Sequence, residues 1–353
     1  MLYRRDCVFV LILVGVLKEQ KNIEKKIQNL GDEIVYKSKI MPIIFIETNN
    51  PSIYTQMDEF ENIYEERTGK LQSVKFIPNA QTSKLKKNGF LAWGVNVAII
   101  DSGINDEIGA LENIDLRGNN NPNDFLNHGT AVASIIKEVA GGVGLINLKI
   151  TDTVDFKERY IIKALDYIGE NLDKINVVNM SLGLSNKCQG NTCAICKTVN
   201  YLSNEGIIFI AAAGNDGPNN NTVTCPAVSE SVVSVGAISV NGNSVARYSG
   251  RGKRNRFKPD LLAPGNVSVD LKCKNEKFSD EGTSFAAPIV SGVAAVLVAK
   301  FKHKEYVINS IKESTDKLPN VPDNHQGHGI LNIDKIVEVF KNDISSRNSE
   351  QQG

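Results

Sequence analysis

Residues 1–70 alternate between short apolar runs and polar stretches. The run Cys7–Leu17 has the length and the valine and isoleucine content of a buried strand. The polar stretch after it repeats isoleucine and leucine at helical spacing until Gly31, and two strand-like runs, a short helix and a last strand follow. This βαββαβ order predicts a ferredoxin-like arrangement, a small sheet covered on one face by two helices. We therefore expect residues 1–70 to form a separate small domain.

The run Cys7–Leu17 also has an alternative interpretation as an export signal, because it follows the basic start MLYRRD. No clear cleavage site follows it, and it is shorter than the roughly 20 apolar residues that a helix needs to span a bilayer. We favour the strand. The location stays open: we favour secretion or the cell surface, with the cytoplasm as the alternative.

After a polar stretch from Leu71 to Gly94, strand-like apolar runs alternate with amphipathic helical stretches. This alternation predicts an α/β domain with a mostly parallel sheet covered by helices on both faces. The predicted strands end at Asp101, Ile150, Ser181, Gly214 and Ile238. Ligands bind outside the carboxyl ends of such strands, so these ends are the first places to look for a site. We assign residues 71–340 to this domain and expect the polar residues 341–353 to form a disordered tail.

The composition excludes several classes of protein. Lys plus Arg and Asp plus Glu both number 40, so the net charge is zero and no overall field attracts the chain to nucleic acid or to an anionic membrane. Hydrophobic residues make up 41% and charged residues 23% of the chain, as in folded globular proteins. We expect no nucleic-acid partner and no stable membrane span.

Ser284 precedes a long run of small and apolar residues with helical periodicity. Its hydroxyl would lie at the positive end of that helix, where developing negative charge is favoured. The neighbouring Gly282 and Ala286 leave room for a substrate backbone, and we expect Pro288 to fall in or near the first helical turn. The alternative role for Ser284 is that of a helix N-cap.

A serine nucleophile needs an adjacent base that is held in position. His128 begins a predicted helix, whereas the other histidines lie in charged or loop-like stretches, at His303, His325 and His328. Asp101 ends an apolar strand and Asn215 follows one, so a carboxylate and an amide would lie at the same sheet edge. Each of these two residues has an alternative role in capping a turn.

The segments VAIIDSG, HGTAVAS, AAAGNDGP and GTSFAAP hold these four residues and follow one another in the chain. Together they resemble the motifs of the subtilase family, including the order Asp, His, Ser. The resemblance runs from about Leu71 to Val339 and implies a subtilisin-like three-layer α/β fold. It implies that Ser284 is the nucleophile, His128 the base and Asp101 the residue that orients it. Asn215 and the Ser284 backbone N–H would bind the oxyanion.

The same resemblance implies a serine endopeptidase that acts on polypeptides. The segment VNMSLG places Ser181, Leu182 and Gly183 on the family's substrate-pairing edge, where an extended substrate adds as a strand. Residues 1–70 resemble the family's inhibitory propeptide, so we expect a self-processing zymogen that is cut between about Thr68 and Val74. We expect a monomer.

The chemistry implied by the resemblance requires no cofactor. Calcium is common in the family, and the loop at residues 118–124 offers oxygen ligands, but Asn-rich turns need no metal and we assign no calcium site. A relative that binds peptides without cutting them is the alternative function. Such a protein should have lost a member of the triad, and here all three residues are present. An α/β-hydrolase would need G-x-S-x-G around its nucleophile, and this pattern is not found.

The cysteines are unevenly spaced. One group forms a C-x4-C-x2-C pattern with a fourth cysteine further on, at Cys188, Cys193, Cys196 and Cys225, while Cys7 and Cys273 stand apart. The group can ligand a metal, form two disulfides or remain as free thiols. We favour disulfides, because the surrounding residues are typical of an exposed loop and exposed thiols pair in an oxidising compartment. This segment directly follows the SLG edge, so it bears on what enters the cleft.

Overall fold

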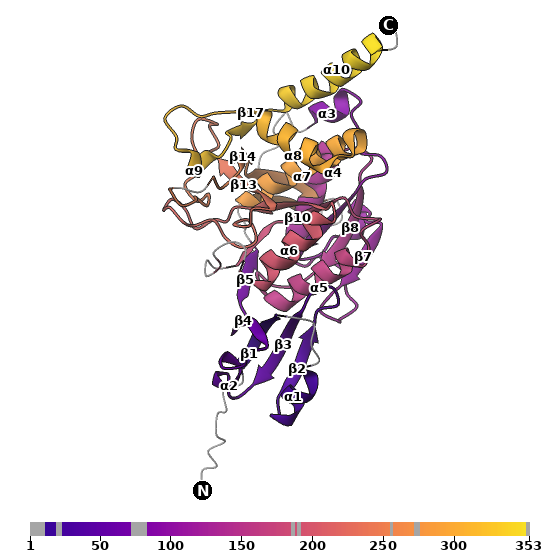
Figure 1. Ribbon diagram of the computed structural model, residues 1–353. Helices are drawn as coiled ribbons and strands as arrows, with labels where there is room; N and C mark the ends of the chain where they lie inside the picture. The colour runs from indigo at the N-terminus through magenta and orange to yellow at the C-terminus, as the bar shows by residue number, and fades with distance from the viewer. Residues whose placement is uncertain are drawn as a thin grey trace.

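The computed structural model describes residues 11–18, 23–71, 83–184, 188, 192–254, 257–271 and 276–350. Figure 1 shows an N-terminal unit, residues 11–71, and a large α/β domain that begins at residue 83. The N-terminal unit packs on the side of the large domain that carries helices α5 (Glu158–Gly169) and α6 (Ala194–Asn204).

The first six elements of the N-terminal unit follow one another in the order βαββαβ. They are β1 (Leu11–Leu17), α1 (Glu24–Asn29), β2 (Glu33–Lys37), β3 (Ile43–Thr48), α2 (Ser52–Thr55) and β4 (Phe60–Glu65). The strands form an antiparallel sheet in the order β2-β3-β1-β4. The strand predicted from the apolar run is confirmed for Leu11–Leu17, and residues 7–10 lie outside the described residues.

The two faces of this small sheet are both covered. Successive side chains of a strand point to opposite faces. Leu13 and Ile44 pack with Tyr54 of α2 in a cluster that belongs to the N-terminal unit alone. Val14 and Phe45 belong instead to a cluster that includes residues of α5 and α6. The outer face is therefore covered by the unit's own helices, and the inner face by the large domain.

The large sheet is parallel except at one end. Within the described residues its order is β17-β18-β14-β13-β12-β10-β6-β8-β7, and only the pair β17–β18 is antiparallel. Its strands are β6 (Asn96–Asp101), β7 (Glu112–Asp115), β8 (Gly144–Lys149), β10 (Val177–Met180), β12 (Ile208–Ala212), β13 (Val232–Ile238), β14 (Leu261–Pro264), β17 (Thr315–Asp316) and β18 (Ile330–Leu331). The five predicted strands are β6, β8, β10, β12 and β13, which are neighbours in the centre of the sheet. Their nearly continuous Val, Ile and Ala content is typical of strands buried on both faces.

Helices cover both faces of the large sheet, which makes three layers (Figure 1). One face carries α4 (His128–Val139), α7 (Thr283–Phe301), α8 (Lys304–Glu313) and α10 (Ile333–Glu350), and the other carries α5 and α6. Helix α7 is long and apolar enough to cross a membrane by length and composition, but 78% of that window is buried inside the protein. It is the central core helix of this layer.

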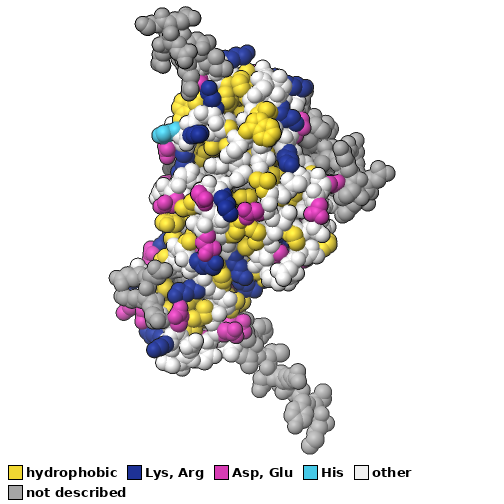
Figure 2. All heavy atoms as spheres, turned by 90° about the vertical axis from the view of Figure 1, so that its right-hand side faces the viewer, with side chains coloured by type: hydrophobic (Ala, Val, Ile, Leu, Met, Phe, Trp, Pro, Cys, Tyr) yellow, Lys and Arg dark blue, Asp and Glu magenta, His cyan; other side chains and the backbone are white. Residues whose placement is uncertain are grey.

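Smaller elements complete the described structure. They are β5 (Thr68–Leu71), β9 (Asp155–Lys157), β11 (Leu182–Leu184), β15 (Asn266–Leu271), β16 (Glu276–Glu281), α3 (Lys84–Lys87), α9 (Asp323–Gln326) and a short 3-10 helix, η1 (Asp106–Ile108). On the face shown in Figure 2, basic and acidic side chains are interspersed, in keeping with the zero net charge.

We expected residues 341–353 to form a disordered tail. This prediction is wrong as far as Glu350, because α10 continues to that residue. Ile336 and Phe340 bury one side of α10 in the core, and Lys300 pairs with Asp343 at 2.9 Å. The helix is thus anchored before its most polar part begins, and no Gly or Pro between residues 333 and 350 ends it. Residues 351–353 lie outside the described residues.

Candidate active site

Asp101 and His128 meet at the carboxyl end of the large sheet. Asp101 is the last residue of β6, between β10 and β8, and His128 is the first residue of α4. His128 Nδ1 lies 2.7 Å from Asp101 Oδ1, and both side chains are buried. A Cβ at Gly129 would lie 2.2 Å from the Gly103 carbonyl oxygen, so only glycine permits this close approach of helix and strand.

A second carboxylate, Asp124, holds this corner in place. Ser102 Oγ donates to Asp124 Oδ1 at 2.8 Å and accepts from the Gly129 N–H at 3.0 Å. Asp124 Oδ2 accepts from the backbone N–H and the hydroxyl of Thr130, at 2.9 and 2.8 Å. Because the Ser102 N–H also donates to Asp101 Oδ1 at 2.7 Å, the network fixes the carboxylate and the start of α4 together. Asp124 was not among the site residues predicted from the sequence, and protein donors bond to both of its carboxylate oxygens.

Ser284 is the second residue of α7, and the N-cap position belongs to Gly282. The alternative role of Ser284 as the N-cap is therefore excluded. The Ser284 hydroxyl donates to the Ser181 carbonyl at 3.0 Å. The ring of Phe285, the next residue, lies 5.4 Å from the His128 ring, centroid to centroid. This contact brings the first turn of α7 against the first residue of α4.

Pro288 lies at the start of the second turn of α7, near the first turn as we expected. A proline has no N–H, so the Ser284 carbonyl lacks its usual partner four residues ahead. Ser181 Oγ donates to this carbonyl at 2.6 Å and replaces the missing bond. Asn179 Nδ2 in turn donates to Ser181 Oγ at 2.9 Å, and Ser291 Oγ donates to Asn179 Oδ1 at 2.8 Å. Helix α7 therefore tolerates Pro288 because β10 and its following residue supply the hydrogen bond.

Asn215 lies just after β12, and its side chain is held by the residue before Ser284. Asn215 Oδ1 accepts from the Thr283 N–H at 3.0 Å and from Thr283 Oγ1 at 2.9 Å. Thr283 Oγ1 also accepts from the Gly214 N–H at 3.1 Å. Gly214 has φ 103°, a left-handed value that favours glycine. Since both bonds use the amide oxygen, the NH2 group of Asn215 points away from Thr283 and can serve as a donor.

The predicted substrate edge is already paired with another strand of the same chain. Leu182–Leu184 form β11, which lies antiparallel to β5, with Leu182 opposite Leu71 and Gly183 opposite Lys70. β5 pairs on its other side with β9. The last described residues of the N-terminal unit thus occupy the edge that follows Ser181.

The remaining histidines lie outside this group. His303 precedes α8 and is largely exposed, His325 of α9 lies 2.8 Å from Asn220 through Nε2, and His328 packs against Phe257.

The cysteine group forms a compact cluster without disulfides. Cys188, Cys193, Cys196 and Cys225 are buried, and no disulfide joins these four described residues. The two disulfides that the sequence analysis favoured are therefore not formed in this structure. The predicted exposed loop is also wrong for these four side chains, because α6 and the residues around Cys225 enclose them. Cys7 and Cys273 lie outside the described residues.

Comparisons with known proteins identify the family of this chain. A model of the subtilase family, peptidase S8, matches residues 93–329. Subtilisin E of Bacillus subtilis is 29% identical over 315 residues, which cover 82% of this chain and 76% of that protein. Serine protease AprX of Bacillus subtilis is 25% identical over 338 residues, 81% of this chain and 76% of that protein.

Of two further matches, one covers only a small part of the relative and the other is to a solved structure. The membrane-bound transcription factor site-1 protease of Rattus norvegicus is 29% identical over 284 residues, and the match covers 74% of this chain but only 26% of that protein. The crystal structure of the epidermin leader peptide processing serine protease EpiP, S393A mutant, from Staphylococcus aureus has a TM-score of 0.73 and covers 94% of this chain and 99% of that chain. At 19% identity this likeness shows the fold alone.

The fold and the strand-end site define a subtilisin-like α/β protein. The chain belongs to the subtilase family.

Proposed function

We propose that this protein is a serine endopeptidase that uses Asp101, His128 and Ser284. The observation that carries the proposal is the 2.7 Å contact between Asp101 and His128 beside the first turn of α7, in a chain of the subtilase family. An isolated serine hydroxyl is a weak nucleophile, and a histidine held in one orientation by a buried carboxylate is the base that it needs.

In the proposed reaction, Ser284 Oγ bonds to the carbonyl carbon of the substrate while His128 Nε2 takes the hydroxyl proton. The carbonyl oxygen becomes an oxyanion, to which Asn215 Nδ2 and the Ser284 N–H donate. His128 then returns the proton to the leaving amine as the C–N bond breaks. A water molecule, activated by the same histidine, hydrolyses the acyl-enzyme. Asp101 keeps the Nδ1 proton of His128 in place and stabilises the imidazolium.

The proposed substrate is an extended polypeptide that lies along Ser181, Leu182 and Gly183. A strand added at this edge gains main-chain hydrogen bonds that depend little on the substrate's side chains. The pairing of β5 with β11 supports this proposal, because it is the arrangement that such a substrate would adopt.

We further propose that the chain is made as a zymogen whose N-terminal unit inhibits it until it is cut. β5 occupies the proposed substrate edge, so an added substrate cannot pair with β11 while β5 is there. Leu71 is the last described residue of β5, and we place the cut a few residues beyond it, within the junction predicted at Thr68 to Val74. The active site of the protein itself would make the cut.

The test compares the intact masses of the purified full chain and its Ser284→Ala variant after incubation. We expect the wild type alone to lose about seventy N-terminal residues, since cleavage requires the nucleophile. Ser134→Ala is the matched control, because the Ser134 hydroxyl bonds only to the Thr130 carbonyl of its own helix among the described contacts, and this variant should be cut like the wild type.

Each outcome separates the two parts of the proposal. If both proteins stay full-length, self-processing is wrong. Another protease is then used to remove the N-terminal unit, and peptidase activity is measured with an added unfolded protein. If Ser284→Ala still hydrolyses that protein, the assignment of the nucleophile fails. A serine-directed phosphonylating inhibitor should label the wild type and leave Ser284→Ala unlabelled.

A further inference from the structure

Four cysteine sulfurs converge on one point beside β11. The Sγ atoms of Cys188, Cys193, Cys196 and Cys225 all lie within 4.8 Å of one another. Four of the separations are 3.1 Å (Cys188–Cys193), 3.5 Å (Cys188–Cys196), 3.6 Å (Cys193–Cys225) and 3.7 Å (Cys196–Cys225). In a tetrahedral site with Zn–S bonds of about 2.3 Å, the sulfurs are about 3.8 Å apart. The observed cluster is close to that size.

The distances do not favour a particular pair of disulfides. Four cysteines allow three pairings into two disulfides. One pairing joins Cys188 to Cys193 and Cys196 to Cys225, at 3.1 and 3.7 Å, and a second joins Cys188 to Cys196 and Cys193 to Cys225, at 3.5 and 3.6 Å. All four distances exceed the S–S bond length of about 2.05 Å, and neither pairing is clearly shorter. Four nearly equivalent sulfurs are what a common centre produces. The compact cluster has room for one ion and not for an iron–sulfur cube with its own sulfides.

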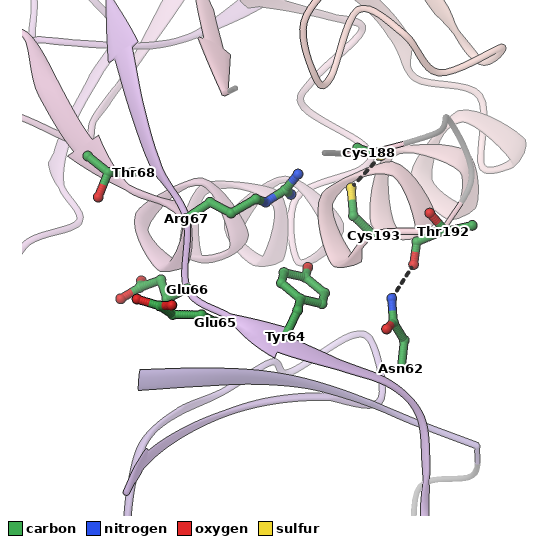
Figure 3. Close-up of a pocket in the computed structure, with 9 residues that line it drawn as sticks. All are labelled: Asn62, Tyr64, Glu65, Glu66, Arg67, Thr68, Cys188, Thr192 and Cys193. Atoms are coloured by element: carbon green, nitrogen blue, oxygen red, sulfur yellow. Dashed lines mark hydrogen bonds between the residues drawn. The ribbon is translucent and has the colours of Figure 1, made fainter. Parts of the chain in front are cut away.

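The chain around the cluster suits thiolate ligands. Cys193 is the N-cap of α6, and its Sγ accepts from the Cys196 N–H at 3.5 Å, so the positive end of the helix faces these sulfurs. The four residues are almost fully buried, with relative exposures between 0% and 5%. Figure 3 shows Cys188 and Cys193 at the wall of a pocket of about 490 Å3, with Arg67 of the N-terminal unit reaching toward them. The Arg67 guanidinium also pairs with Glu158, and it adds positive charge near these sulfurs only while the N-terminal unit is docked.

We propose that Cys188, Cys193, Cys196 and Cys225 bind one structural Zn2+ ion in a tetrahedral S4 site. With four protein ligands the site is closed, so the ion holds structure and takes no part in peptide hydrolysis. Tetrahedral thiolate sites select zinc or iron among the biological metals, and zinc requires no redox partner.

The zinc ion joins the substrate edge to the helix behind it. The Leu184 N–H at the end of β11 donates to the Cys225 carbonyl at 2.9 Å, and Cys193 and Cys196 belong to the start of α6. The same corner contacts the N-terminal unit, because Asn62 Nδ2 donates to the Thr192 carbonyl at 3.1 Å and the Ala194 N–H donates to Tyr64 Oη at 3.0 Å. The ion would therefore keep β11 in position before and after the N-terminal unit leaves.

The test measures the metal in the full-length Ser284→Ala protein, purified without a histidine tag from cells supplied with both zinc and iron. We expect about one zinc per chain by elemental analysis. X-ray absorption at the zinc edge should show four sulfur neighbours at about 2.3 Å. Because these readouts need neither turnover nor self-processing, they are independent of the proposed peptidase function.

Four results would overturn the proposal. Intact mass without reductant could show that the four cysteines have lost hydrogens as disulfides. Elemental analysis could find iron in place of zinc. It could also find no metal, while a thiol reagent finds four reactive cysteines. The absorption spectrum could show nitrogen or oxygen neighbours instead of four sulfurs, which would mean that the zinc is bound elsewhere.

Variants locate the site. Cys193→Ser and Cys225→Ser should each reduce the zinc content to less than about a tenth of that of the parent protein. Cys7→Ser and Cys273→Ser are the matched controls and should retain it. If the first two variants do not fold, cobalt replaces zinc in the parent protein during growth, and the visible spectrum of tetrahedral cobalt–thiolate then supports the site, while an octahedral spectrum contradicts it.

Discussion

The buried carboxylates Asp101 and Glu158 differ in where their hydrogen-bond partners lie: those of Asp101 are in the large domain, and those of Glu158 are in the N-terminal unit. Neither side chain has any exposed surface. Asp101 is bonded to Ser102 and His128, which belong to the large domain, as it does. Glu158 of α5 accepts from Arg67 Nε at 2.9 Å, Arg67 Nη2 at 2.5 Å and Tyr64 Oη at 3.1 Å, all from the N-terminal unit.

The difference separates a permanent site from a contact that can be released. The Asp101 network stays complete when the N-terminal unit is absent, because each of these partners remains. Glu158 would lose these partners, but it would then face water, where a carboxylate is well solvated. Asp166, further along α5, is also held by partners from the N-terminal unit. It accepts from Ser38 Oγ at 2.5 Å and from the Tyr36 hydroxyl. Burial in the complex, and then the bond to Asp166, raise the pKa of Tyr36 above its usual range, so the phenol stays protonated and keeps donating.

The largest loss of activity should come from a substitution in the hydrogen-bond network of Asp101, Ser102 and His128. Asp101→Asn should lower kcat by about 10⁴-fold, because the amide can donate to His128 and favours the wrong tautomer of the imidazole. The N-terminal unit should remain docked, since it makes none of these bonds. The measurement is the first-order rate of self-cleavage by intact mass, because an added protein cannot pair with β11 while the N-terminal unit stays docked. Hydrogen exchange of β1 to β4 is the structural readout. A variant that keeps more than a tenth of the activity would remove Asp101 from its proposed role.

A smaller effect should come from Asn215→Ala. The loss of one oxyanion donor lowers kcat by about 10²- to 10³-fold and should change KM much less, because the donor acts on charge that develops in the transition state. Steady-state kinetics on a peptide substrate separate the two constants. If KM rises and kcat stays the same, Asn215 binds substrate instead. Thr283→Ser is the control, because it keeps the hydroxyl and the N–H that bond Asn215 Oδ1.

The elements that could be predicted from the sequence are those whose pattern is local. Strands buried on both faces have continuous apolar runs, so the centre of the large sheet was predicted correctly, and Asp101, His128, Asn215 and Ser284 stand at the ends or starts of such elements. β14, with the sequence LLAP, was missed because it is short and ends in proline. β5 was missed because its residues are polar and its strand form depends on pairing with β9 and β11.

Contacts between residues that are far apart in the sequence could not be predicted from the local sequence pattern. Ser181 and Ser284 are 103 positions apart, and the hydrogen bond that compensates for Pro288 appears only after β10 and α7 are packed. Asp124 lies in an Asn-rich loop whose composition predicts turns and oxygen ligands equally well. The cysteines were expected to be exposed because their neighbours in the sequence are polar, whereas their burial comes from α6 and from Cys225, about thirty residues further on.

Glu158→Gln should weaken the contact between the N-terminal unit and α5, because it removes the ion pair with Arg67. This change leaves the Arg67 guanidinium, whose side chain is 9% exposed, without its charged partner, which costs about 3 kcal/mol for a buried pair. In the Ser284→Ala background, where the chain stays intact, amide exchange of β1 to β4 should become about 100-fold faster. The amides of β6 and β12 should not change. Unchanged exchange in the N-terminal unit would show that apolar packing alone holds it.

The smallest effect should come from Glu170→Gln, at the end of the same helix. Glu170 pairs with Lys39 of the N-terminal unit at 2.9 Å, but its side chain is 44% exposed and that of Lys39 61%. Exposed pairs contribute about 0.5 kcal/mol or less, so exchange of β1 to β4 should change by about twofold at most, and salt should remove the difference. Both substitutions remove one negative charge from the α5 side of the contact. If Glu170→Gln loosens the N-terminal unit as much as Glu158→Gln does, the total charge of this surface controls docking, and the burial of Glu158 does not.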